Sequence, residues 1–334
     1  MKRLLVIHSF LMAAGLAGER KIVVLDEAGR GAEGAQVEAV LTPPDDPRLS
    51  SVTTQTGRTD AAGIFRFQAD DKMILSRVKA RQAGCFTADA DHRHGLGRPE
   101  TGSELTLTLP RLTELVPLHY REVQLVGLPK AKWVGFDAEV GDAIAPWGRG
   151  MITDFNFMVS IEQIGWTESA EAMAMLRRTA EGARMDDSEW AAAYGRFRGV
   201  IRLSFPRTGD GIMPTPAFWP YCRLKMPALA PTDGYAGEKN LPFDTLNVSE
   251  PADQHTGYYL RLRSQLDGEN RMTSAHYAKI HGRIEAGPGR VVFRFYYNPR
   301  AGDRRLAMDV GRNLLRPPPG SSPREQERFQ AFDP

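Results

Sequence analysis

Residues 134–157 read VGFDAEVGDAIAPWGRGMITDFNF, and the fold expected for the longer half of the chain follows from this stretch. Apolar and polar residues alternate over 136–140, which predicts a strand with Asp137 and Glu139 facing outward. Apolar residues resume at 152–157, and the glycines and Pro-Trp-Gly corner in between predict tight turns. The stretch therefore predicts the corner of a β-sheet.

Further strands are expected on both sides of this corner. Residues alternate over 200–205 and 258–263, 115–125 predicts a strand with a proline break, and 291–297 predicts an apolar, aromatic strand. A helical periodicity occurs over 167–194, where Gly182 separates two amphipathic halves. Residues 113–315 therefore predict a larger β-sandwich-like domain with a short helical insertion.

The preceding residues, 19–112, predict a smaller antiparallel β-sandwich. Strand patterns at 21–25, 37–41, 64–67 and 105–109 are separated by turns rich in glycine and aspartate. The fold class expected for the whole chain is mainly β, with two sandwiches in series.

Two motifs in the first domain carry a family resemblance. VLDEAGRGAEGAQVEAV (24–40) followed by TGRTDAAGIFRF (56–67) resembles the carboxypeptidase regulatory-like, transthyretin-like or prealbumin-like β-sandwich. The specific part is Thr59-Asp60, Gly63 and Phe65. The resemblance implies an accessory module in which these residues are structural, and it brings no catalytic residue.

A second resemblance covers most of 116–315. Segments such as LSFPRTGDGI (203–212), SAHYAKIHGRI (274–284) and VVFRFYYNPRAGDRR (291–305) resemble a family of uncharacterised secreted bacterial proteins with the same domain order. Ala143 stands where a Trp is common in that family. The resemblance implies export but no activity.

The first residues have the three parts of a secretory signal. Lys2 and Arg3 precede an apolar run over 4–16, and Gly15-Leu16-Ala17 is a small-residue cleavage site. Residues 1–17 are therefore expected to be a signal peptide, with the protein periplasmic or extracellular and without a membrane span after cleavage. The chain has 43 basic and 41 acidic residues, so loss of Lys2 and Arg3 leaves 41 of each. This balance gives no reason to expect a nucleic-acid partner.

Export permits a disulfide between Cys85 and Cys222, the two cysteines of the chain. Two separate buried thiols are the alternative, since sequence does not fix the distance between them.

Four carboxylates near the corner are candidates for acid/base chemistry. Asp137, Glu139, Asp142 and Asp154 include possible pairs for cleavage of a glycosidic bond. The alternative is that they are strand-face and turn residues. Asp142 and Trp147 are the ligand-binding candidates of this stretch.

A long proline-rich connection supplies a second candidate site. Trp219 and Tyr221, with Phe218 before them, form an aromatic platform for a sugar ring or a peptide in one interpretation. In the other, these side chains are buried and close one end of the sandwich.

The sequence patterns that point to a metal site or to histidine chemistry are weaker than these. Asp91, His92 and His94 are a candidate metal site, with a solvated polar loop as the alternative. His276 and His281 are five residues apart on an expected strand, so they are predicted to face opposite sides.

The last residues, 316–334, are rich in proline, serine and charge, which predicts a disordered tail. The sequence contains no nucleophile, metal or phosphate motif, and it implies no cofactor. It favours an exported non-enzymatic binding or envelope-associated module, with a carbohydrate or an envelope protein as partner. A polysaccharide-acting hydrolase or carbohydrate-binding protein is the alternative, so enzymatic activity stays open.

Overall fold

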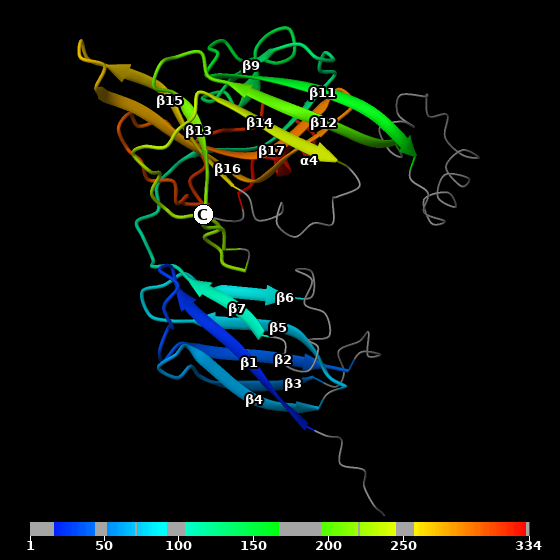
Figure 1. The fold of residues 1–334 in the computed structure, drawn as a ribbon, viewed down its shortest axis with the longest axis vertical. Coiled ribbons are helices and arrows are strands. Elements are labelled where there is room, and N and C mark those ends of the chain that lie inside the picture. Colours follow the sequence, from blue (N-terminus) through cyan, green and yellow to red (C-terminus); the bar gives the residue numbers. More distant parts are fainter. Residues whose placement is uncertain are drawn as a thin grey trace, which may run out of the picture. The chain divides into compact units, whose positions relative to one another are not determined.

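The computed structural model describes residues 17–43, 52–70, 72–91, 104–166, 195–219, 221–244, 257–331 and 334. The chain divides into two compact units. Unit 1 contains Met1–Leu112 and Tyr221–Arg223, and unit 2 contains Thr113–Pro220 and Leu224–Pro334. Strands dominate both units, as Figure 1 shows, and the mainly β fold class is confirmed.

Unit 1 is a sandwich of two sheets. One has the order β4 (Ile64–Asp70), β1 (Ala17–Asp26), β7 (Glu104–Leu109). The other has the order β3 (Thr53–Arg58), β2 (Gln36–Thr42), β5 (Ile74–Arg81), β6 (Ala88–Asp91). Alternate residues such as Ile22, Val37 and Val78 are fully buried and form one core. The period-two patterning explains these strands.

The Thr-Asp-x-x-Gly-x-Phe motif of unit 1 is a structural turn. The hydroxyl of Thr59 accepts a hydrogen bond from Ala35 N, and the carboxylate of Asp60 accepts from Ala62 N and Ile64 N. Gly63 has φ +78°, and a Cβ there would lie 2.3 Å from the carbonyl oxygen of Val24. Glycine is therefore required at this position.

Unit 2 is a larger sandwich of two five-stranded sheets. The first has the order β10 (Asp142–Ala143), β9 (Val134–Asp137), β11 (Phe155–Trp166), β12 (Gly195–Ser204), β14 (Glu238–Asp244). The second has the order β13 (Gly211–Pro214), β15 (Tyr258–Leu266), β16 (Met272–Gly287), β17 (Arg290–Asn298), β8 (His119–Val126). Residues of both sheets share a core around Phe136, Phe155, Phe293 and Phe295.

The second sheet of unit 2 is buried on parts of both faces. Tyr277 and Tyr296 belong to a separate apolar cluster, which also contains Met226, Leu306 and Met308 from long connections. Neighbouring residues such as Ala278 and Tyr297 belong to the inter-sheet core. This arrangement gives the sheet an inner face and an outer face.

Two expectations for unit 2 are wrong. Asp137 is 2% exposed rather than facing outward, because β9 ends at Asp137 and the chain turns there. Residues 316–331 are not a disordered tail. They include the short helix α4 (Pro323–Glu327), and Phe329 is 7% exposed, with its carbonyl oxygen accepting a hydrogen bond from Asn313. Specific contacts with unit 2 thus outweigh the composition of this segment.

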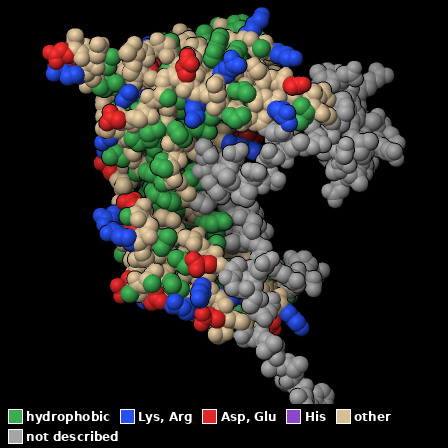
Figure 2. Space-filling model, in the orientation of Figure 1, with side chains coloured by type: hydrophobic (Ala, Val, Ile, Leu, Met, Phe, Trp, Pro, Cys, Tyr) green, Lys and Arg blue, Asp and Glu red, His purple; other side chains and the backbone are tan. Residues whose placement is uncertain are grey.

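The structure bears on only some of the remaining sequence predictions. The expected helical insertion at 167–194 and the expected leader at 1–16 lie outside the described residues. Cys85 and Cys222 both belong to unit 1 and are not joined by a disulfide. In the described part of the chain no helix is long and apolar enough to cross a membrane. On the face shown in Figure 2, basic and acidic side chains of the described residues are intermingled.

Candidate functional site

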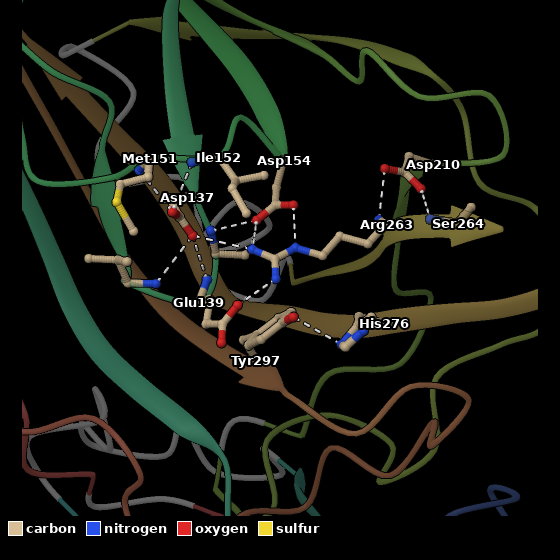
Figure 3. A network of polar contacts seen from close by, with 12 residues as sticks. Asp137, Glu139, Met151, Ile152, Asp154, Asp210, Arg263, Ser264, His276 and Tyr297 are labelled. Carbon is tan, nitrogen blue, oxygen red and sulfur yellow. Dashed lines mark hydrogen bonds and ion pairs between the residues drawn. The ribbon is translucent and has the colours of Figure 1, made fainter.

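A half-buried arginine gathers three of the carboxylates that the sequence suggested for catalysis. Arg263, on β15, extends its guanidinium between Asp154, Asp137 and Glu139, as Figure 3 shows. Its Nε and Nη2 donate to the two oxygens of Asp154 at 2.8 and 3.0 Å. Since β15 belongs to one sheet and the acids to strands or turns of the other, we call these four residues the inter-sheet clamp.

The backbone of Arg263 is fixed as firmly as its side chain. Its φ is 53°, a left-handed conformation that costs a non-glycine residue about 1–3 kcal/mol. The carboxylate of Asp210 accepts hydrogen bonds from Arg263 N and Ser264 N at 2.9 and 2.7 Å. Burial raises the pKa of Asp210. Burial also opposes the charge of Arg263, but hydrogen bonds with Asp154 and Glu139 prevail and raise its pKa.

Asp137 and Asp154, the two buried acids of the clamp, have few oxygens left for a substrate. Asp137 accepts from the guanidinium and from four backbone amides, those of Glu139, Val140, Met151 and Ile152. Asp154 is fully buried and also accepts from Ala138 N. A general acid or base must reach the reacting atom. This arrangement therefore supports a structural role for these carboxylates.

Asp142 and Trp147 lie in the same corner but belong to another arrangement. The carboxylate of Asp142 lies 3.4 Å from Arg121 and 3.1 Å from Arg149. Trp147 is partly buried against the inter-sheet core. A Cβ on Gly148 would lie 2.3 Å from Ala143 O, so close backbone approach explains this glycine. These contacts describe a folded corner rather than a ligand site.

Two histidines lie beside the clamp around Tyr297. His276 shares a 2.9 Å hydrogen bond with the Tyr297 hydroxyl, and its ring is stacked on that of Tyr297. The Nδ1 of His119 donates to the carbonyl oxygen of Glu139 at 2.8 Å. Burial lowers the pKa of both histidines. Both rings are thus neutral at pH 7 and engaged in protein contacts.

The candidate residues of the aromatic connection, Trp219 and Tyr221, are both at least partly buried. Trp219 is 9% exposed and belongs to unit 2, whereas Tyr221 belongs to unit 1 and packs partly against its core. For the metal candidates, His92 and His94 lie outside the described residues, as does the side chain of Asp91. Among the residues that are described, no group of three or more potential ligands is placed to hold a metal ion.

A pocket on the outer face of the second sheet was not predicted. On β16 and β17, His281 pairs with Arg294 and Glu285 pairs with Val292. Residues 282–284 therefore lie opposite Phe293 alone, and Gly282 takes a φ of +76° in this bulge. A bulge bends its strand and re-aims side chains. Here it adjoins a cavity of about 430 Å³, which we call the bulge pocket.

His281 is the most unusual residue in the bulge pocket. It is 8% exposed and lines the cavity, and within the described part of the chain its imidazole has no hydrogen-bond partner. The ring of Phe218 lies 5.5 Å from it. Burial lowers the pKa of His281 well below 6.5, and the nearby charges of Lys279, Arg294 and Lys225 lower it further. His281 therefore offers one neutral donor and one neutral acceptor.

Charged side chains surround these two rings. Arg283, Arg290 and Arg294 line the pocket together with Glu122 and Glu285. Arg294 lies 3.7 Å from Glu122, and Arg283 lies 3.4 Å from Glu285. The pocket thus combines aromatic surface with convergent polar groups, which is typical of ligand sites.

Sequence reasoning missed this pocket although one signal was present. His276 and His281 were expected on opposite faces, and their contacts with Tyr297 and with Phe218 agree with that. Gly282 interrupts an apolar strand pattern, and such a glycine often marks a bulge. The pairing partners of the bulge were not evident from sequence.

Comparisons with known proteins add little. No protein-family model and no curated protein matches the chain. The shaft pilin spaA from Lactobacillus rhamnosus GG aligns with 87% of this chain and 95% of its own, at 9% identity and a TM-score of 0.20. A DUF3823 family protein from Parabacteroides merdae ATCC 43184 aligns with 87% and 99%, at 9% identity and a TM-score of 0.17. These TM-scores are too low to bear on function.

Proposed function

We propose that this chain is an exported, non-enzymatic binding module whose ligand site is the bulge pocket. The observation that carries the proposal is His281, a nearly buried imidazole that lines a cavity without a hydrogen-bond partner among the described residues. Its ring nitrogens are not sealed off from solvent, so they are free to hydrogen-bond to water or to a ligand in the cavity. A volume of about 430 Å³ lies within the range of small-molecule sites.

The non-enzymatic part of the proposal rests on the inter-sheet clamp. The carboxylates that a hydrolase would use are bound to Arg263 and to backbone amides. Export rests on the leader pattern of residues 1–17 and on the family resemblances. A carbohydrate is a suitable ligand, because hydroxyl groups match the acceptors and donors of the pocket and a ring matches Phe218.

A binding screen tests this function. The chain without its leader is tested against soluble polysaccharides and peptidoglycan fragments, and each ligand found is retested with Phe218→Ala. We expect at least one ligand whose binding weakens about tenfold in this variant, since an aromatic contact contributes up to about 1.5 kcal/mol beyond the area that it buries. The matched control is Trp133→Ala, an aromatic that is 48% exposed and outside the pocket. If binding weakened equally in both variants, or in neither, the bulge pocket would not be the ligand site.

A further inference from the structure

The charge of the bulge pocket points to one class of ligand. Three arginines and two glutamates line it, and burial keeps His281 neutral at pH 7, so the lining carries one net positive charge. The Arg294–Glu122 and Arg283–Glu285 pairs account for four of these five charges. Arg290 has no carboxylate partner among the described residues. One guanidinium is therefore left for a ligand.

A single guanidinium suits a carboxylate. Its planar fork matches the two oxygens of that group and forms charge-assisted hydrogen bonds. A phosphate monoester carries close to two negative charges at pH 7, and it would meet Glu122 and Glu285 in the same pocket. The balance of charge thus favours a monoanion.

The remaining groups suit a polyhydroxylated ring. Glu122 and Glu285 are acceptors for hydroxyl groups, and His281 supplies a donor and an acceptor. Phe218 provides apolar surface beside the imidazole. An acidic peptide would use the arginine but would leave these acceptors facing its own carboxylates.

We propose that the bulge pocket binds a carboxylate-bearing saccharide, with its carboxylate on Arg290, its ring against Phe218 and a hydroxyl hydrogen-bonded to His281. This inference rests on the proposed function and names the ligand class of the same site. It also assigns Arg290 as the residue that makes the pocket prefer the negatively charged saccharide to an uncharged derivative such as its ester.

Calorimetric titration of the leaderless chain with galacturonate, a sugar with a single carboxylate, and with its methyl ester tests the inference. The two probes share their rings and hydroxyl groups and differ in charge. We expect the acid to bind at least about tenfold more tightly, because a charge-assisted hydrogen bond is lost in the ester. Arg290→Met should abolish this preference, whereas Phe218→Ala should weaken both probes. Arg271→Met is the control, because this arginine is 70% exposed and does not line the pocket.

The outcomes separate the inference from the proposed function. Equal affinity for acid and ester, or a preference that survives Arg290→Met, would overturn the ligand class. The binding function would stand if Phe218→Ala still weakened the ester. Displacement of the acid by equimolar inorganic phosphate would also overturn the choice of a carboxylate. If neither galacturonate nor its methyl ester bound, this inference would be wrong, and the broader screen with Phe218→Ala would decide the function separately.

Discussion

Replacing Arg263 by methionine should destabilise unit 2 strongly. The variant keeps most of the aliphatic chain but removes the guanidinium that is shared by Asp154, Asp137 and Glu139. Asp154 would be left without its charged partner, because its side chain is 0% accessible to solvent and, among the described residues, only Ala138 N would still donate to it. Breaking a buried ion pair from one side costs about 3–5 kcal/mol. For a domain of this size, that corresponds to roughly 6–20 °C in Tm.

Urea unfolding followed by tryptophan fluorescence measures this effect in unit 2 alone. All five tryptophans belong to unit 2; they are Trp133, Trp147, Trp166, Trp190 and Trp219. Arg271→Met is the matched control, since its pair with Asp267 is on the surface and such pairs contribute about 0–1 kcal/mol.

A second variant tests the cause of the loss. Asp154→Asn in the Arg263→Met background removes the stranded charge, so the double variant should lose less than the sum of the two single changes. If Arg263→Met lost no more stability than Arg271→Met, or if the two changes were additive, the clamp would not hold the sheets together in the way described.

Three further predictions concern other parts of the chain. Gly63→Ala should cost unit 1 about 2 kcal/mol more than Gly29→Ala by calorimetry, because both have φ +78° but only a Cβ at Gly63 would clash, with Val24. His281→Gln should reduce the loss of stability that urea titrations show as the pH falls below about 6.5. The pKa of His281 is lower in the folded state than in the unfolded state, so the unfolded state binds more protons in this range and acid favours unfolding. Phe329→Ala should lower the stability of unit 2 by about 3 kcal/mol, and a loss within error of zero would contradict the packing of the last segment.

Period-two patterning predicted most strands and the mainly β fold class. In strands such as β2, β4 and β17, apolar and polar residues alternate over several positions, so the sequence itself indicates which face is buried. The polar β3 was missed, because its pairing with β2 rather than its own pattern makes it a strand.

The candidate site was less predictable for a physical reason. Asp137 and Glu139 have the composition of an acid/base pair, but Arg263 is more than a hundred residues later in the sequence, and only the fold brings it to them. The last segment was misjudged in the same way. Its order depends on distant partners, among them Asn313, rather than on its proline and serine content.

His276 and His281 show which property separates a structural residue from a site candidate. Both lie on β16, and burial lowers the pKa of both. His276 is hydrogen-bonded within the protein, to the hydroxyl of Tyr297. His281 lies at a bulge that adjoins a cavity, and no described residue satisfies its imidazole. Its ring nitrogens are accessible to solvent there, so a ligand exchanges a hydrogen bond with water for one with the protein, which contributes about 0.5–1.5 kcal/mol. The bulge at Gly282, rather than the acidic corner of 134–157, is therefore where recognition is expected.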